Sequence, residues 1–380
     1  MIYLDSAAST KVPSEVIASI TNAYTEVYGN SSSRTHRHGT LAAEHIHSAR
    51  QDVTSLIDEK PESLVFTSGA TESNNLAILG LSQYFNEQRK KAHVITGATE
   101  HKSVLEPLRR IEDEGLIELT ILKPSESGSI SVADVQSVLK PETRLISLMH
   151  VNNETGAETL VDEVADSLKG SDALFHVDAS QSFGKFNTYR LEHPRIDMIS
   201  VSAHKMFGPQ GIGGLILRRR DFKLPPIKPL SQGGGQERGL RPGTIPTALC
   251  AGFGCAAQMS KENMSIWLDA VRRQKMALLE ELKSNYSVHE VAYNGSPYIL
   301  SVMIEEINSE AALIALKDSF SVSNGSACTS QSFSVSHVLE AMGFRENECD
   351  SVIRFSFSPF EKNLEGHLKE ISNLLKKAKY

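Results

Sequence analysis

The chain has 380 residues, of which 40% are hydrophobic and 22% are charged, as is typical of folded globular proteins. Its formal net charge is -7 at pH 7, which argues against a general nucleic-acid-binding protein because a surface that follows phosphates is normally basic. A basic run at residues 218–220 is expected to be a solvated strand end. A chain of this length exceeds the usual size of a single core, so we expect one large domain and a smaller one.

The amino-terminal sequence and the cysteine content indicate a protein of the cytoplasm. Residues 1–10 include Asp5 and lack the basic-then-apolar order of a signal peptide. No apolar run is long enough to cross a membrane. Four cysteines are too few for a disulfide framework in a chain of this size, so the thiols are expected to be free.

Short apolar runs, separated by stretches of helical or loop character, mark the expected strands of a central sheet. They lie at residues 64–66, 93–95, 119–122, 145–149, 174–177, 198–201 and 214–217. Several of them lack an alternation of polar and apolar residues, which is typical of strands covered on both faces. The pattern predicts an α/β domain with a mainly parallel sheet.

After about residue 250 the pattern changes, and a second domain of the α+β type is predicted. Residues 265–285 carry apolar side chains at helical spacing, among them Trp267 and Val271. Strand-like runs follow at residues 299–304 and 352–357, with helical sequence between and after them.

Polar residues directly after the predicted strands are the first candidates for a binding site, because ligands of open α/β sheets lie beyond the carboxyl ends of the strands. Residues 67–74, with the sequence TSGATESN, follow one strand and open a predicted helix. Backbone N–H groups there could hold a phosphate, although an ordinary capped helix is the better explanation of this segment taken alone. The segment is neither a P-loop nor a GxGxxG dinucleotide motif.

Asp178 and Lys205 follow two further predicted strands. A carboxylate at the end of a buried strand is costly unless a cation lies beside it, and a protonated pyridine nitrogen would be such a cation; helix capping is the simple alternative. A partly desolvated lysine in the turn at residues 202–209 suits Schiff-base chemistry, whereas an isolated lysine is usually surface charge. Together with the phosphate segment, the two residues favour a pyridoxal phosphate (PLP) site.

The four cysteines differ in their surroundings. Cys328 lies in a Ser/Gly-rich segment, residues 323–332, that is typical of a loop, and a thiol there could act as a nucleophile in its thiolate form. Cys250, Cys255 and Cys349 are interpreted as structural or incidental. The C-x4-C spacing of the first two has no matching second pair, so no metal site is expected.

Motifs along nearly the whole chain then carry a resemblance to a known family. They lie, in the family's order, at residues 3–5, 29–30, 33–37, 67–74, 99–101, 150–154, 177–181, 202–205, 233–239, 241–244, 325–330 and 353–356. On these motifs the chain resembles the cysteine desulfurases, class-V aminotransferase enzymes of PLP fold type I, in the group with the longer catalytic-cysteine loop that includes NifS-like and IscS-like members.

The resemblance implies a role for each matching residue. Lys205 would hold PLP as a Schiff base, His101 would stack on the ring and move protons, and Cys328 would carry the persulfide. The other implied cofactor-binding residues are Asp178 at the pyridine nitrogen, Gln181 at the phenolic oxygen, and Ala70, Thr71, Ser202 and His204 around the phosphate, with Thr244 contributed by the partner subunit of a homodimer. Asn153 and Arg354 would bind the substrate carboxylate.

The resemblance also implies the domain division and the reaction. Residues 14–255 would form a large PLP-binding domain with a mainly parallel seven-stranded sheet, and residues 1–13 and 256–380 a smaller α+β domain carrying the Cys328 loop. The enzyme would convert L-cysteine to L-alanine and pass the sulfur to an acceptor protein, without direct nucleic-acid or membrane binding.

Departures from the commonest family pattern leave the acceptor open. Ala203, Gln236, Pro242 and Asn324 replace residues that are more frequent in the family. The protein is also expected to lack the longer tail of members that dock an iron–sulfur scaffold. Iron–sulfur cluster assembly, tRNA thiolation and DNA phosphorothioate modification all stay open. The alternatives are a selenocysteine lyase or another fold type I lyase or aminotransferase and, in a different class, a non-catalytic sulfur-relay scaffold.

Overall fold

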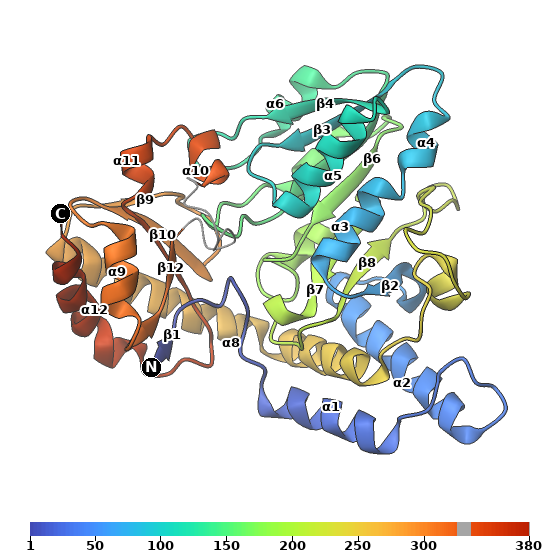
Figure 1. Cartoon of the computed structure of the whole chain (residues 1–380), viewed down its shortest axis with the longest axis horizontal. Helices are drawn as coiled ribbons and strands as arrows, with labels where there is room; N and C mark the ends of the chain where they lie inside the picture. The colour runs from blue at the N-terminus through green and yellow to red at the C-terminus, as the bar shows by residue number, and fades with distance from the viewer. Residues whose placement is uncertain (325–335, 380) are drawn as a thin grey trace.

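A computed structural model describes residues 1–324 and 336–379 of the chain. The described residues form a seven-stranded sheet, a four-stranded sheet and a two-stranded pair, with helices packed around them (Figure 1). No helix in these two ranges is long and apolar enough to cross a membrane.

The large sheet contains every strand that was predicted for the first part of the chain. Its strands are β2 (Leu64–Thr67), β3 (Ala92–Gly97), β4 (Ile117–Leu122), β5 (Thr143–Met149), β6 (Leu174–Asp178), β7 (Met198–Ser202) and β8 (Gly213–Leu217). Their spatial order is β2-β8-β7-β6-β5-β3-β4. Only β8 is antiparallel to its neighbours, β2 and β7, so the predicted α/β fold with a mainly parallel sheet is confirmed.

Both faces of this sheet are covered, which explains why its strands lack alternation. Leu215 and Leu217 of β8 pack into a core with α3 and α5 on one face, whereas Ile216 packs into a core with α2 and α7 on the other. The edge strand β4 is the exception, because its middle residues are half-buried or exposed. The helices of this part are α1 (Ser14–Glu26), α2 (Arg37–Thr54), α3 (Ala70–Leu79), α4 (Ser82–Asn86), α5 (Lys102–Asp113), α6 (Val132–Val138) and α7 (Val161–Ser167).

The smaller sheet has the order β12-β13-β10-β9 and packs against the carboxyl-terminal helices. The remaining strands are β1 (Ile2–Tyr3), β9 (Val288–Glu290), β10 (Ile299–Ile304), β11 (Phe320–Ser321), β12 (Ser323–Asn324) and β13 (Val352–Ser356). The remaining helices are α8 (Thr247–Asn285), α9 (Ser309–Leu316), α10 (His337–Ala341), α11 (Glu346–Cys349) and α12 (Leu368–Leu375). The amino-terminal strand β1 pairs with β11, so both ends of the chain lie beside this smaller part (Figure 1).

Helix α8 is much longer than the helix predicted at residues 265–285, because it begins at Thr247. Its first half packs against α1 and α2, and its second half supplies Trp267 and Val271 to the core of the smaller part. The predicted boundary after residue 255 therefore falls within one continuous helix (Figure 1). The division into two domains stays a prediction.

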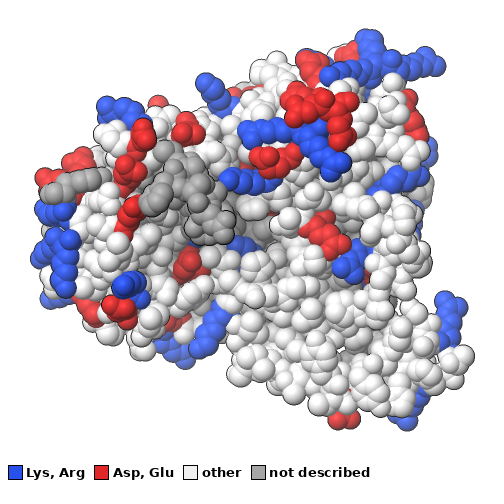
Figure 2. All heavy atoms as spheres, in the orientation of Figure 1, with Lys and Arg blue, Asp and Glu red and all other residues white. Residues whose placement is uncertain are grey.

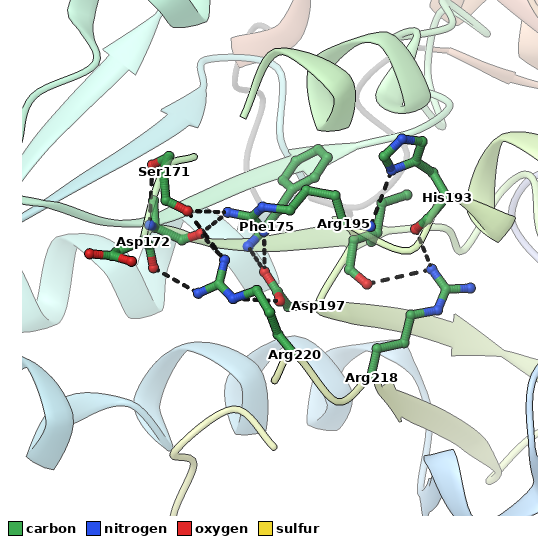
Figure 3. Close-up of polar contacts among 10 residues, drawn as sticks. Ser171, Asp172, Phe175, His193, Arg195, Asp197, Arg218 and Arg220 are labelled. Atoms are coloured by element: carbon green, nitrogen blue, oxygen red, sulfur yellow. Dashed lines mark hydrogen bonds and ion pairs between the residues drawn. The ribbon is translucent and has the colours of Figure 1, made fainter. Parts of the chain in front are cut away.

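A network of ion pairs and hydrogen bonds lies at the amino ends of β6 and β7 (Figure 3). Asp197 is 2% exposed; it accepts a hydrogen bond from Phe175 N at 2.8 Å and pairs with Arg195 at 2.6 Å. Burial raises the pKa of Asp197, against the lowering effect of Arg195 and Arg220. The prediction that residues 218–220 are solvated is wrong for Arg218, which is 5% exposed and pairs with Glu59.

Replacing Asp197 tests how much this network stabilises the fold. Asp197→Ala leaves the half-buried Arg195 without its counter-ion and Phe175 N without its acceptor, so the free energy of unfolding should fall by about 3 kcal/mol. Urea denaturation followed by fluorescence measures it. Asp172→Ala, in an exposed residue of the same region, should change stability by less than about 0.5 kcal/mol; equal effects of the two variants would contradict the assignment.

Candidate active site at the carboxyl ends of the strands

A cavity of about 470 Å³ opens at the carboxyl ends of the central strands, where the fold class places its ligands. It brings together residues that follow β2, β3, β5, β6 and β7, residues 7–9 from the amino-terminal segment, and Arg354 of β13. The residues of the predicted site that line it are Ala70, Thr71, His101, Asn153, Asp178, Gln181, Ser202, His204, Lys205 and Arg354.

Asp178 lies at the buried end of β6, near the middle of the sheet. Its Oδ2 accepts a hydrogen bond from Asn74 Nδ2 at 2.8 Å, and its Oδ1 accepts bonds from the backbone N–H and the hydroxyl of Ser180. A buried carboxylate needs such donors because it has left water. Asn74 belongs to the segment singled out in the sequence, but its contact with Asp178 was not predicted.

Lys205 and His204 follow β7 and face the amino-terminal segment. Lys205 Nζ donates hydrogen bonds to the carbonyl oxygens of Ala7 and Ala8. His204 Nδ1 lies 3.2 Å from Ser9 Oγ. Burial, helped by the positive charge of Lys205, lowers the pKa of His204 to about 4, so this imidazole is neutral at physiological pH.

Gln181 accepts a hydrogen bond from a lysine that was not predicted to belong to the site. Gln181 Nε2 donates to Ala7 O at 2.8 Å, and Lys185 Nζ donates to Gln181 Oε1 at 3.4 Å. Lys185 is fully buried beside the ring of Tyr298, and burial, with Lys205 as a second cause, lowers its pKa to about 7. Nothing in the sequence distinguished this lysine from a surface one.

The turn between β2 and α3 presents backbone to the cavity. Gly69 has a φ of 155°, and Gly213 of β8 packs so tightly against it that an added Cβ would lie 2.7 Å from Gly69 Cα. Among the described residues, the buried Ser202 Oγ has no hydrogen-bond partner, and a Cβ added at Gly69 would lie 3.7 Å from it. Small residues therefore leave room at the start of α3.

Arg354 and Asn153 meet at the wall shared with the smaller part of the molecule. Arg354 is 3% exposed; its Nη1 donates to Asn153 O at 2.8 Å, and its Nη2 pairs with Asp5 at 2.7 Å. In the sequence Asp5 counted against a signal peptide and belonged to the matching motif at residues 3–5, but it was given no role in the site. The Asp5 carboxylate holds the guanidinium group of Arg354 from one side.

Two predicted site residues are not part of this cavity as described. Thr244 is exposed and does not line it. The loop before Thr244 is attached to the large sheet, because the buried Glu237 pairs with Arg50 and accepts a hydrogen bond from Phe66 N at 2.7 Å. Cys328 lies outside the described residues, 1–324 and 336–379.

The other three thiols are poor nucleophiles. Burial is the first cause that raises the pKa of Cys250 and of Cys255, and it raises the pKa of Cys349 to about 11. A thiol with a raised pKa has little thiolate at neutral pH. No group of three or more His, Cys, Asp or Glu side chains in the described ranges is arranged to hold a metal ion.

The fold and this cavity define a fold type I transferase, with a lysine and an aspartate at the ends of adjacent strands of a mainly parallel sheet. The sequence matches the class-V aminotransferase family over residues 2–365. It is 40% identical over 373 residues to the cysteine desulfurase IscS of Vibrio cholerae, covering 96% of this chain and 89% of that one.

Solved structures are also similar to nearly the whole of this chain. DndA from Streptomyces lividans is 41% identical with a TM-score of 0.81, covering 94% of this chain and 99% of that one. SspA in complex with cysteine is 35% identical with a TM-score of 0.82, covering 95% and 100%. The chain belongs to the class-V aminotransferase family and, within it, to the cysteine desulfurases. Membership of this family implies PLP as the cofactor.

Gly213→Ala tests whether the close approach of β8 to Gly69 shapes the cofactor site. The added methyl would lie 2.5 Å from Val201 O and 2.7 Å from Gly69 Cα, so β7 and the Gly69 turn must shift apart. Overpacking of this kind costs about 1–3 kcal/mol, so the affinity for PLP should fall about tenfold or more. The visible absorbance of the reconstituted protein, titrated with PLP, measures this affinity.

Gly366→Ala is the matched control, because an added methyl there meets nothing within 4 Å. It should bind PLP as the wild type does. Unchanged affinity in Gly213→Ala would show that the turn does not depend on the glycine.

Proposed function

We propose that this protein is a PLP-dependent cysteine desulfurase that converts L-cysteine to L-alanine, stores the sulfur as a persulfide on Cys328 and passes it to an acceptor protein. The observation that carries the proposal is the joint lining of one cavity by Lys205, Asp178, His101 and Arg354 in a chain of the desulfurase family. This set of residues also disfavours the non-catalytic scaffold, which has no use for a reactive lysine.

The residues present fit PLP. Ser202 Oγ, which has no other described partner, and the backbone at Ala70 and Thr71 suit a phosphate at the start of α3. His204 is neutral and can donate a hydrogen bond to the same phosphate. Asp178 suits a protonated pyridine nitrogen, Gln181 a phenolic oxygen and Lys205 Nζ the aldehyde carbon. Bound PLP would supply an electron sink that weakens bonds at the α- and β-carbons of the substrate.

Arg354 and Asn153 would orient the substrate. A guanidinium binds a carboxylate through two parallel hydrogen bonds, and Arg354 is already fixed by Asp5 and by Asn153 O. The amino acid would then be held with its α-carbon toward Lys205, whose amine can take the α-proton at Nζ once it is released from its covalent role.

Cys328 would take the sulfur in a balanced displacement. Its thiolate attacks the substrate sulfur, an S–S bond forms, the substrate carbon–sulfur bond breaks, and the β-carbon gains a proton to become the methyl group of alanine. Cysteine and a thiol thus become alanine and a persulfide, and no external oxidant is needed. The raised pKa of each described thiol supports Cys328 as the nucleophile.

A homodimer in which Thr244 reaches the partner's cofactor is part of the proposal. Thr244 is exposed and lies outside its own cavity. Helix α1 exposes Ile17 and Tyr24, at 53% and 64%, and the corresponding region of Figure 2 carries few charged residues. Exposed large apolar side chains on a face with few charges are typical of subunit contacts.

The sulfur acceptor is proposed to be a protein and not a nucleic acid. On the face drawn in Figure 2, basic and acidic side chains are interspersed and form no continuous basic stripe. The formal net charge of -7 agrees with this, because a surface that binds nucleic acid along its phosphates is normally basic.

The test is the formation of alanine and protein-bound persulfide from L-cysteine by the PLP-loaded protein. Cys328→Ala and Lys205→Ala should each retain less than about 1% of the wild-type rate, because each removes a group that takes part in the chemistry. Cys255→Ser, at a partly exposed thiol of raised pKa, should keep the wild-type rate.

Two outcomes would replace the proposal. If Cys328→Ala still releases sulfur at the wild-type rate, Cys328 is not the nucleophile and a lyase takes its place. If the purified wild type binds no PLP, the sulfur-relay scaffold becomes the better explanation.

A further inference from the structure

His101 is held through one of its two ring nitrogens. It is the residue that caps α5, and its Nδ1 accepts a hydrogen bond from the backbone N–H of Ser103 at 3.1 Å. Ser103 Oγ lies 2.8 Å from the same nitrogen. A backbone N–H can only donate, so Nδ1 must present its lone pair to it and carry no proton.

The hydroxyl of Ser103 is oriented by Asn74. Asn74 Nδ2 donates to Ser103 Oγ at 2.9 Å and to Asp178 Oδ2 at 2.8 Å. A carboxylate accepts only, so the amide must turn its NH2 group to Asp178, and its second hydrogen then points at Ser103 Oγ. The hydroxyl oxygen accepts from Asn74, and its own hydrogen is left to share the single lone pair of His101 Nδ1 with the backbone N–H of Ser103.

We propose that Asn74 and Ser103 are positioning residues that fix His101 in the neutral form with its proton on Nε2. Through them a chain of hydrogen bonds runs from Asp178 by way of Asn74 and Ser103 to His101. The inference rests on the proposed function only in treating His101 as a residue of the active cavity. Ser103 follows the recognised Thr-Glu-His motif by two positions and was not assigned a role from the sequence.

The charges around His101 favour the same state. Burial lowers its pKa first; Lys205, His337 and Lys102 lower it further, and Asp178 alone acts in the other direction. The amino end of α5 also disfavours a positive charge. His101 is therefore neutral at physiological pH, and its Nε2, with the proton in place, enters the reaction as a hydrogen-bond donor and holds no lone pair with which to accept a proton.

Nuclear magnetic resonance of the PLP-loaded full chain, labelled with 15N in its histidine rings, reads the tautomer directly. The His101 signals, identified as those lost in His101→Gln, should show an unprotonated Nδ1 and a protonated Nε2. Ser103→Ala should raise the pKa of His101 by about 0.7 of a unit, the shift expected when one hydrogen bond to the neutral form is lost. Ser103→Thr keeps the hydroxyl and should restore the wild-type value.

Activity provides a second readout with a defined sign. Below its pKa, His101 gains a second proton on Nδ1, which opposes the backbone N–H of Ser103 and displaces the ring from its fixed position. The acidic limb of the pH profile should therefore move to higher pH in Ser103→Ala and return in Ser103→Thr. Ser137→Ala, in an exposed serine of α6, is the matched control and should move neither the signals nor the limb.

The failures of the two proposals are distinguishable. A protonated Nδ1 in the wild type, or unchanged His101 signals in Ser103→Ala, overturns this inference whatever the enzyme does with cysteine. A wild type that makes no alanine but shows the Nε2–H form removes the proposed desulfurase activity and still supports the Asn74–Ser103 arrangement.

Discussion

The requirement to keep a carboxylate in the interior determines the arrangement of this cavity. Asp178 ends a strand that is buried along its whole length, so its charge depends on donors supplied by neighbouring elements. Asn74 comes from α3 and Ser180 from the turn after β6. Both residues are placed by the parallel sheet, because each lies beyond a carboxyl strand end. The cavity is therefore a consequence of strand order as much as of residue type.

Much of the fold could be predicted from the sequence, because burial on both faces leaves an unmistakable pattern in the central strands. The continuity of α8 from Thr247 to Asn285 as one helix could not. Gly252 and Gly254 are poor helix formers, but a Cβ at Gly252 would lie 2.6 Å from Ile20, and a Cβ at Gly254 would lie 2.8 Å from Ala49. These glycines allow α1 and α2 to approach the helix closely, so tertiary packing overrides local propensity there.

The residues of the site also fall into those that could be predicted from the sequence and those that could not. Asp178 and Lys205 stood out because they follow strands, and the family motifs added His101, Gln181, Asn153 and Arg354. The supporting residues were given no role from the sequence, although Asp5 and Asn74 lie within matching motifs, since each acts through a contact that only the folded chain creates. They are Asp5, Asn74, Ser103 and Lys185. Burial, which gives Lys185 its altered pKa, cannot be recognised from a single lysine in a sequence. The role of Cys328 stays a prediction from its motif.

The direction of β8 has a consequence for how this chain can change over evolution. Parallel neighbours must be joined by a crossover of a dozen or more residues, whereas antiparallel neighbours can be joined directly. Because β8 returns beside β7, the connection that contains Lys205 spans only residues 203–212. Insertions can be absorbed in the long crossovers at the same end of the sheet, but an insertion beside Lys205 would displace the lysine itself. We expect this connection to keep a constant length while its neighbours vary.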